Sequence, residues 1–504
     1  MVKHLLPLIG LLTITGLQAE TVPALVIGSH TSVALQDITS VQFTSSALTV
    51  HLTDGTQLLE PLADLTFGTI EAQGIAQLPV DEAASYAVYD QGGRLMKSGR
   101  TTASDPLVGL QPGSYILRQG GQSRKVSLCG SAARTCYAAS DLSAAVPTRV
   151  LATDASAMQI CLPGIDPMTD LSTIDCLTFD PDGTLMHVLR SGVSSDFSIA
   201  DISRITFGAL QESVTVVYGE DSVDGINPFH FDGVSLATVG AGVTVTSTYP
   251  TEVEYALSGS SANGYFKIYS SVKWQANLLG LTLTNPVGPA INSQTGKKGT
   301  IHLQKGYDNQ LCDGATYAES AEDQKGCIFS EGQIIFNGQG SLQVTSLYKH
   351  GIVSDDYVSF DNGTVTVLSA VSDAVHAKDS VIFQAGTVTL SPSSDGVDCD
   401  GPIFIRQGDN GSPVLSITTT GDGAKGIKTG ADFMMSDGTV TITQTGHKKV
   451  EDGDTSRVIG IKAAGNIIIT GGSVTINNTA DGGKDVSADG SIIVSDSAWV
   501  SWRQ

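Results

Sequence analysis

Two stretches, one repeat apart, decide the fold of this chain. Residues 352–367 read IVSDDYVSFDNGTVTV, and residues 375–390 read VHAKDSVIFQAGTVTL. Both stretches carry apolar residues at alternate positions, and Gly363 and Gly386 stand eleven residues after their respective first residues. Such alternation, interrupted by Gly and Asp, predicts three short β-strands in each stretch.

The same pattern returns along the C-terminal part of the chain. Counted from Ile352, successive repeats begin after 23, 22, 30, 34 and 25 residues by subtraction, at Val375, Val397, Ile427, Ile461 and Val486. In every repeat the residue two positions after the start is small, and the residues six and eight positions after it are apolar. A repeat near 22 residues with three strands is typical of one turn of a parallel β-helix, because stacked turns bury a core that one turn cannot bury alone.

We therefore predict an all-β protein, with a right-handed parallel β-helix preceded by small antiparallel β modules. A flat antiparallel sandwich would not keep these columns in register across six repeats. The longer intervals then correspond to loops inserted at the turns, around Gln407–Val414 and Gly446–Arg457.

The N-terminus has the pattern of a secretory signal. Lys3 and His4 precede an apolar run from Leu5 to Ile14, and Ala19 is a plausible cleavage point. The apolar run is too short to span a bilayer, so we expect an exported protein, secreted or at the cell surface, that is not an integral membrane protein. The predicted organisation is a signal peptide (1–19), antiparallel β modules (20–130), a linker (131–158), a short β segment (159–220) and the β-helix (221–504).

The net charge of the chain excludes some classes of binding partner. The sequence has 28 Lys and Arg against 51 Asp and Glu, a formal net charge of −23. So acidic a chain does not bind nucleic acid through a general field. It also repels anionic polymers unless cations or local Lys clusters intervene. We expect a monomer whose partner is a polysaccharide.

Residues 20–210 carry no chemistry that we can identify. Residues 37–68 and 174–208 resemble each other: both have a strand, an Asp-Gly turn, a second strand and a closing Thr-Phe-Gly. Between them, AVYDQGGRL (residues 87–95) and GSYILR (residues 113–118) resemble the sorting and anchoring modules of secreted Bacteroidetes proteins. A spacer or a docking module is the expected role.

The C-terminal part resembles a known family. The stretches that carry the resemblance are VDGI (223–226), HGIVSDD (350–356), SDAVHAKDSV (372–381) and SDGVD (394–398). They are similar to those of secreted bacterial carbohydrate-binding proteins whose parallel β-helix is like that of pectate lyases, and the similarity extends over residues 221–504. The resemblance implies binding of plant-type polysaccharide, including acidic polysaccharide, with calcium held by the β-helix. The sequence departs from that pattern where Lys residues occupy the last repeats.

One column of the repeats suggests a metal site. Two residues before the repeat starts stand His350, Asp373 and Asp395, so the two carboxylates lie about one strand spacing, ~4.8 Å, apart. Oxygen ligands gathered at one edge suit calcium. The predicted calcium ligands are Asp373, Asp395, Asp398, Asp400 and Asp422. The alternative is that these Asp residues only form turns.

A second column suggests a ligand-binding face. One residue after the repeat starts, the outward column contains His376, Lys428 and Lys462, and Lys378 lies on the same face. Lys side chains beside a bound cation would suit the carboxylates of uronate sugars. A solvated face of alternating charge is the alternative.

Three functions remain open on this sequence. The first is a non-catalytic carbohydrate-binding protein at the cell surface. The second is a calcium-dependent polysaccharide lyase with Lys428 as the general base. The third is a structural or adhesive surface protein. The non-catalytic function is preferred to the lyase because the Lys column is repetitive and nothing in the sequence would lower the pKa of Lys428.

The positions of the Cys residues do not decide which of them form disulfides and which stay free thiols. Cys312 and Cys327 flank a polar loop and are able to pair in an exported protein, whereas Cys399 falls in the small inward column and is expected to be a buried thiol.

Overall fold

The computed structural model describes residues 20–29, 31–72, 85–90, 94–100, 113–119, 122–128, 135–136, 155–451 and 454–502. The expected signal segment 1–19 and most of the expected linker 131–158 lie outside these ranges. The all-β class is confirmed: the described residues form strands and four short 3-10 helices, without an α-helix. Correspondingly, they include no helix with the length and apolarity needed to cross a membrane.

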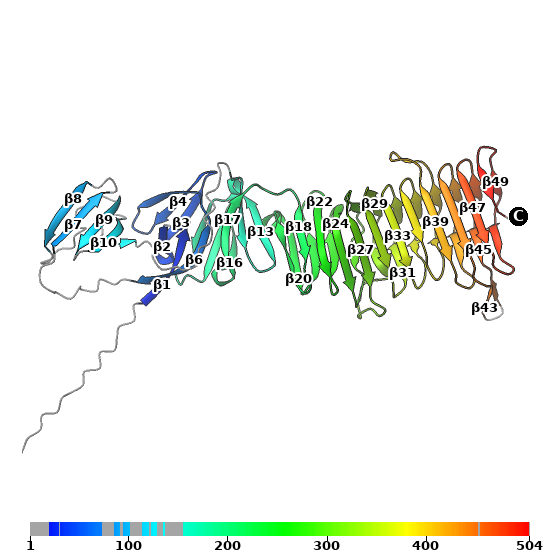
Figure 1. The fold of residues 1–504 in the computed structure, drawn as a ribbon, viewed down its shortest axis with the longest axis horizontal. Helices are drawn as coiled ribbons and strands as arrows, with labels where there is room; N and C mark the ends of the chain where they lie inside the picture. The colour runs from blue at the N-terminus through cyan, green and yellow to red at the C-terminus, as the bar shows by residue number, and fades with distance from the viewer. Residues whose placement is uncertain are drawn as a thin grey trace, which may run out of the picture. The chain divides into compact units, whose positions relative to one another are not determined.

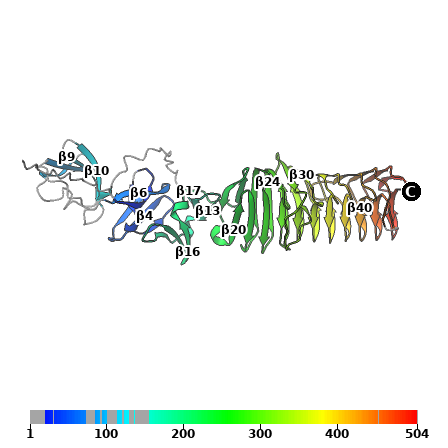
Figure 2. The same ribbon diagram turned by 90° about the horizontal axis from the view of Figure 1, so that it is seen from below.

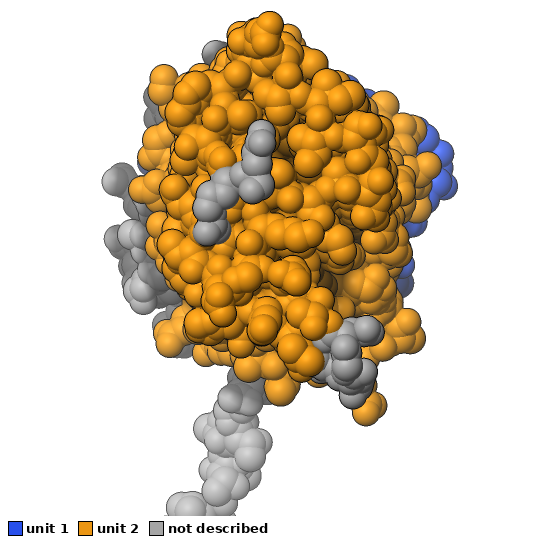
Figure 3. Space-filling model, turned by 90° about the vertical axis from the view of Figure 1, so that its right-hand side faces the viewer, with its two compact units in different colours: residues 1–161, 170–209 blue, residues 162–169, 210–504 orange. Residues whose placement is uncertain are grey.

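The chain forms two compact units (Figure 3). One comprises Met1–Cys161 and Asp170–Ala209, and the other comprises Leu162–Thr169 and Leu210–Gln504. Residues 170–209 therefore fold together with residues 20–72, although the sequence suggests two separate segments. The reason is that strands of one segment pair with strands of the other.

The first unit is built from antiparallel pairs. A six-stranded sheet has the order β16-β15-β14-β3-β4-β5, so the two similar segments meet at its centre, where Leu177 pairs with Val41. Its elements are η1 (Leu35–Asp37), β3 (Ile38–Phe43), β4 (Ala47–Leu52), β5 (Gln57–Pro61), η2 (Leu171–Thr173), β14 (Cys176–Phe179), β15 (Leu185–Arg190), β16 (Val193–Ser198) and η3 (Ile199–Asp201).

Two further groups of strands complete this unit. β6 pairs with β1 and, through Leu65, with β17, which pairs with β12. These strands are β1 (Glu20–Ile27), β2 (Thr31–Ala34), β6 (Leu65–Ala72), β12 (Ala157–Cys161) and β17 (Arg204–Gly208). A five-stranded sheet of order β11-β10-β9-β7-β8 consists of β7 (Ser85–Asp90), β8 (Leu95–Arg100), β9 (Gly113–Gln119), β10 (Gln122–Leu128) and β11 (Thr135–Cys136).

The second unit is dominated by three ladders of parallel strands, and each repeat contributes one strand to each ladder (Figure 1, Figure 2). The first ladder contains β20 (Val234–Val239), β21 (Gly242–Ser247), β23 (Tyr265–Ser270), β25 (Ile291–Ser293), β28 (Gly326–Ser330), β31 (His350–Ser354), β34 (Val375–Ala377), β37 (Val397–Cys399), β40 (Lys425–Thr429), β45 (Ile459–Ala463) and β48 (Lys484–Ala488). Only its first pair, β20 with β21, is antiparallel.

The long strand β24 belongs to both other ladders, because its first half pairs with β26 and its second half with β27. The second ladder contains β22 (Val253–Ser261), β24 (Trp274–Asn285), β26 (Gly299–Leu303), β29 (Ile334–Gly338), β32 (Tyr357–Phe360), β35 (Ser380–Phe383), β38 (Ile403–Ile405), β41 (Phe433–Met435), β46 (Ile467–Ile469) and β49 (Ile492–Val494). The third continues through β27 (Asp308–Asp313), β30 (Ser341–Thr345), β33 (Thr364–Ser369), β36 (Thr387–Leu390), β39 (Val414–Thr419), β42 (Thr439–Gln444), β47 (Ser473–Asn478) and β50 (Trp499–Ser501).

The register predicted from the repeats is confirmed. Ile352 pairs with Val375, Val375 with Val397, and the series continues through Ile427, Ile461 and Val486. The predicted insertions are also present: Gly408 and Gly411 bridge within one, and the other carries the hairpin of β43 (Lys449–Glu451) and β44 (Asp454–Ser456). At the start of the unit lie β13 (Ile165–Asp170), β18 (Val214–Tyr218), β19 (Val223–Asn227) and η4 (His230–Asp232).

The core is made of the inward columns of the three ladders. Phe336, Phe360 and Phe383 stack along the second ladder, with ring centroids 5.2 and 5.0 Å apart and interplanar angles of 12° and 6°. Stacking follows from register, since equivalent residues of successive repeats lie one strand spacing apart. Cys399 is a buried thiol as expected, and Cys312 and Cys327 are free thiols, so the suggested disulfide between them is not formed.

The segment 314–325, between β27 and β28, covers part of the first ladder. Glu322 receives hydrogen bonds from Lys267 and Tyr269 on β23, and the Gln294 side chain donates to the Asp323 carbonyl (3.0 Å). Further along the ladder, His376, Asp398, Lys428 and Lys462 are partly exposed on its outward side.

Replacing one aromatic of the stack tests the core. Phe383→Ala removes a fully buried ring, and we expect it to lower the free energy of unfolding by about 4 kcal/mol. Ile382→Ala changes the adjacent, partly exposed residue of the same strand and should cost much less. Urea midpoints followed by circular dichroism compare the two variants, and equal shifts would contradict this assignment of inward and outward columns.

Candidate functional site

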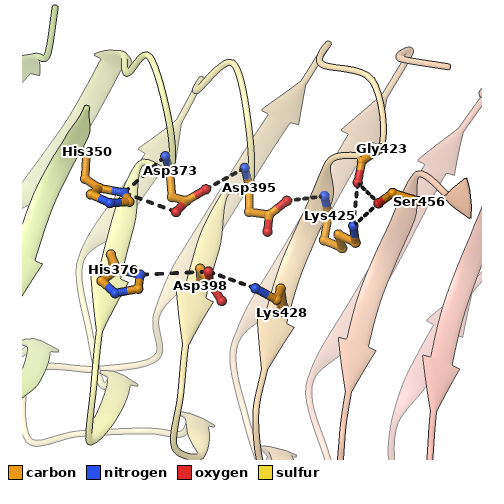
Figure 4. Close-up of polar contacts among 9 residues, drawn as sticks. All are labelled: His350, Asp373, His376, Asp395, Asp398, Gly423, Lys425, Lys428 and Ser456. Atoms are coloured by element: carbon orange, nitrogen blue, oxygen red, sulfur yellow. Dashed lines mark hydrogen bonds and ion pairs between the residues drawn. The ribbon is translucent and has the colours of Figure 1, made fainter. Parts of the chain in front are cut away.

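Seven charged or titratable side chains form two rows across the first ladder (Figure 4). We call them the polar array. The upper row comes from residues two before each repeat start, and the lower row from residues one after it. The upper row is His350, Asp373, Asp395 and Lys425; the lower row is His376, Asp398 and Lys428.

The upper row links successive repeats through side chain to backbone hydrogen bonds. The backbone N–H of Asp395 donates to Asp373 Oδ1 (3.0 Å), and that of Lys425 donates to Asp395 Oδ1 (2.7 Å). His350 Nδ1 lies 3.1 Å from Asp373 Oδ2. Lys425 Nζ donates to the Gly423 carbonyl (2.6 Å) and to Ser456 Oγ (2.7 Å). All members of the upper row except Lys425 are buried. The carboxylates of Asp373 and Asp395 each accept a hydrogen bond from the backbone of the next repeat.

The lower row is more open. Lys428 Nζ lies 2.9 Å from Asp398 Oδ2, and His376 Nδ1 lies 3.8 Å from the same oxygen. The His376 ring stacks on that of His350, with centroids 4.8 Å apart and an interplanar angle of 20°. The Lys428 side chain is 41% exposed, so its ammonium group is within reach of a ligand on this face.

Burial and neighbouring charges set the pKa values of the carboxyl groups. Burial raises the pKa of Asp395 to about 6; the charges of Asp373 and Asp398 add to this effect, and the hydrogen bond from Lys425 N–H opposes it. Burial also acts to raise the pKa of Asp373, but hydrogen bonding and the charge of His350 outweigh it and leave that pKa lowered. The two buried carboxyls of the upper row therefore have opposite shifts.

The two Lys residues of the array also differ. Burial acts to lower the pKa of Lys428, yet its hydrogen bond and ion pair with Asp398 outweigh burial and raise it. Burial lowers the pKa of Lys425. A raised pKa keeps the Lys428 ammonium protonated, which opposes its use as a general base.

The other predicted site residues lie outside the array. Lys462 pairs in register with Lys428 and extends the lower row by one repeat. Lys378 lies just beyond β34, where its Nζ is 2.8 Å from Asp355 Oδ2. Asp400 is exposed, and Asp422 Oδ1 accepts the backbone N–H of His447 (2.9 Å) in a turn.

The predicted calcium ligands do not gather as one group. Among the described residues, one group of three ligand-type side chains has all its ligand atoms within 4.8 Å of one another. Its members are His350, Asp373 and His376. Calcium sites use six to eight oxygens, whereas two of these three side chains are imidazoles. The sequence pattern places His350 first in the column of Asp373 and Asp395, but it does not predict His350 as a metal ligand. The stacking of His376, from the next repeat, on His350 is a contact that the pattern does not show.

Two small hollows of the described surface lie away from the array. A depression of about 70 Å³ on the third ladder is lined by Thr282, Gln310, Gln343, Thr345 and Leu368, among others. A second, in the first unit, is about 20 Å³. Both are well below the roughly 300–1,000 Å³ of small-molecule sites, and neither is lined by a residue of the array.

A known family model matches most of the second unit. The family model described as carbohydrate-binding domain-containing protein matches residues 240–499, which is 260 of the 504 residues by subtraction. The chain belongs to this family. A solved structure, that of a polysaccharide lyase-like protein from C. thermocellum in a gadolinium derivative, is 20% identical; the match covers 57% of this chain and 99% of that chain, with a TM-score of 0.39. No curated protein matches the sequence.

The raised pKa of Asp395 predicts a pH-dependent stability. The folded state holds this proton more tightly than the unfolded state, whose ordinary pKa is 3.8, so stability falls as the pH rises from about 4 to about 6. Asp395→Asn keeps an acceptor for Lys425 N–H without the charge. We expect this variant to be more stable than the wild type above pH 6, by at most about 3 kcal/mol, and equally stable below pH 4.

Melting temperatures measured against pH, in buffer with a chelator, check this expectation. Asp422→Asn is the matched control, because Asp422 is exposed and Asn also accepts the N–H of His447. Parallel pH profiles for Asp395→Asn and the wild type would contradict the assigned burial effect.

Proposed function

We propose that this protein is an exported, non-catalytic carbohydrate-binding protein that holds a polysaccharide along the outward face of the first ladder. Family membership supports carbohydrate binding. The parallel pairing of three strands per repeat supports a right-handed parallel β-helix as the architecture. The apolar segment near the N-terminus supports export to the cell surface or medium.

The observation that carries the proposal is the in-register pair Lys428 and Lys462 on an open face. Two Lys residues whose backbones lie one strand spacing apart, about 4.8 Å, offer charge-assisted hydrogen bonds to oxygens along an extended chain. Asp398 neutralises part of the Lys428 charge, and the partly exposed Lys462 extends the row. An acidic, pectin-like polymer fits this row better than a neutral one, because Lys ammonium groups attract its carboxylates. They offset locally the repulsion that the net charge of −23 exerts on such a polymer.

A calcium-dependent lyase is the alternative that the sequence resemblance to pectate-lyase-like proteins suggests. Its base would need a lowered pKa, and Lys428 has a raised one. This observation favours binding without cleavage.

Calcium dependence is part of the same proposal and is tested with it. Asp398 and Asp400 lie on one strand end, where Asp400 is exposed and Asp398 is 15% exposed. A polymer-borne carboxylate would supply further oxygens to a calcium ion held between protein and sugar. Removing the ion would then weaken binding of an acidic polymer and leave a neutral polymer unaffected.

Electrophoresis through gels that contain polygalacturonate, with and without a chelator, tests binding of the full chain. We expect retardation with the polymer left intact. The double variant Lys428→Ala, Lys462→Ala should bind at least about ten-fold more weakly, the effect of losing about 1.4 kcal/mol.

The matched control is Lys297→Ala, Lys305→Ala, which makes the same change in net charge at residues outside the array. If both double variants lose binding equally, the effect is one of net charge and not of this face. Loss of polymer in the wild-type track would make the protein a lyase, and free migration in acidic and neutral polymers would favour a structural or adhesive role.

A further inference from the structure

Three ligand-type side chains from neighbouring repeats converge at the N-terminal end of the polar array. The ligand atoms of His350, Asp373 and His376 all lie within 4.8 Å of one another. Within this group, His350 Nδ1 and Asp373 Oδ2 are 3.1 Å apart. Ligands bound tetrahedrally at about 2.0–2.1 Å from an ion are separated by about 3.3 Å, so this pair already has the required spacing and His376 needs to approach by an ångström or so.

His376 has a nitrogen that the protein leaves unused. Its Nδ1 is shielded from solvent and makes no hydrogen bond, and Asp398 Oδ2, at 3.8 Å, is too far away for one. A buried polar atom without a partner costs free energy, so such an atom needs a reason. The His376 ring stacks on that of His350, with centroids 4.8 Å apart.

The carboxylate of the group is held in position by the backbone. Asp373 Oδ1 accepts the N–H of Asp395 (3.0 Å), which leaves Oδ2 directed at His350. Hydrogen bonds of this kind fix the orientation of metal ligands in proteins. His350 and Asp373 are buried, whereas the His376 side chain is 20% exposed, so an ion has access from the side of His376.

We propose that His350, Asp373 and His376 form a site for a divalent transition metal ion of the zinc type. Two imidazoles and one carboxylate are a donor set of zinc sites that keep an open coordination position. Asp398 Oδ2, 3.8 Å from His376 Nδ1, stays paired with Lys428, so the fourth position is left to water. Calcium is disfavoured at this point because it requires more oxygens than the group offers.

This site is independent of polysaccharide binding at Lys428 and Lys462. An ion bound by these three side chains would link β31 to β34 and would stabilise the middle of the first ladder. Loss of metal binding therefore would leave the proposed carbohydrate-binding function standing, and the reverse also holds.

Titration of Zn²⁺ into the full chain, purified without a tag and freed of metal with a chelator, tests the proposal. We expect one Zn²⁺ per chain by equilibrium dialysis and a rise in melting temperature on addition of Zn²⁺. His376→Ala should weaken binding at least ten-fold and abolish the rise in melting temperature. The removed side chain is partly exposed and makes no hydrogen bond through Nδ1, so the variant should still fold.

His447→Ala is the matched control, since His447 lies in the inserted loop outside the group, and it should bind Zn²⁺ like the wild type. Co²⁺ provides a second measurement: its visible spectrum should show nitrogen and oxygen ligands in the wild type and should be lost in His376→Ala. Zn²⁺ binding unchanged in His376→Ala, a Co²⁺ spectrum with thiolate bands, or binding of Ca²⁺ without Zn²⁺ would each overturn the proposal.

Discussion

The structure of the second unit depends on one constraint: each residue stacks on the equivalent residue of the next repeat, one strand spacing away. Apolar residues satisfy this constraint by packing, as the rings of Phe336, Phe360 and Phe383 do. Charged residues satisfy it most favourably where the sign changes between repeats or where burial shifts a pKa, because like charges about 4.8 Å apart repel each other. The polar array follows this rule. Its rows pass from imidazole through carboxylate to ammonium.

The same constraint explains why Asp and Asn recur at the turns. Asp373 and Asp395 each accept the backbone N–H of the equivalent residue in the next repeat. Asp432 does the same for Asn466, and Asn466 does so for Ser491, in a second series at another turn. A short side chain with an oxygen at this position satisfies a donor that the ladder leaves unpaired. These residues thus have a structural role that is separate from any ligand they bind.

The function we propose uses the contrast between the packed core and the outward face of the first ladder. The inward columns fill the core, whereas the described outward side of the first ladder offers partly exposed side chains at a regular spacing. A polymer suits such a face because it repeats as the ladder does. The segment 314–325 covers the strands before the array through Glu322, and the Lys side chains that follow are partly exposed. Recognition without cleavage is the function that we propose for this arrangement.

The sequence by itself determined the repeat, the register and the columns, because the pairing of Ile352 with Val375 and Val397 is a direct consequence of periodic apolar residues. It also placed His376, Lys428 and Lys462 together in one column. Only the tertiary structure decided which side chains of different columns contact each other. His350 stacks on His376 although the two belong to different columns and different repeats, and Asp398 turns toward Lys428. Likewise, only the folded chain joined residues 170–209 to residues 20–72. Periodicity fixes neighbours along a ladder, whereas the contacts across it depend on side-chain rotamers and on strand pairings distant in the chain.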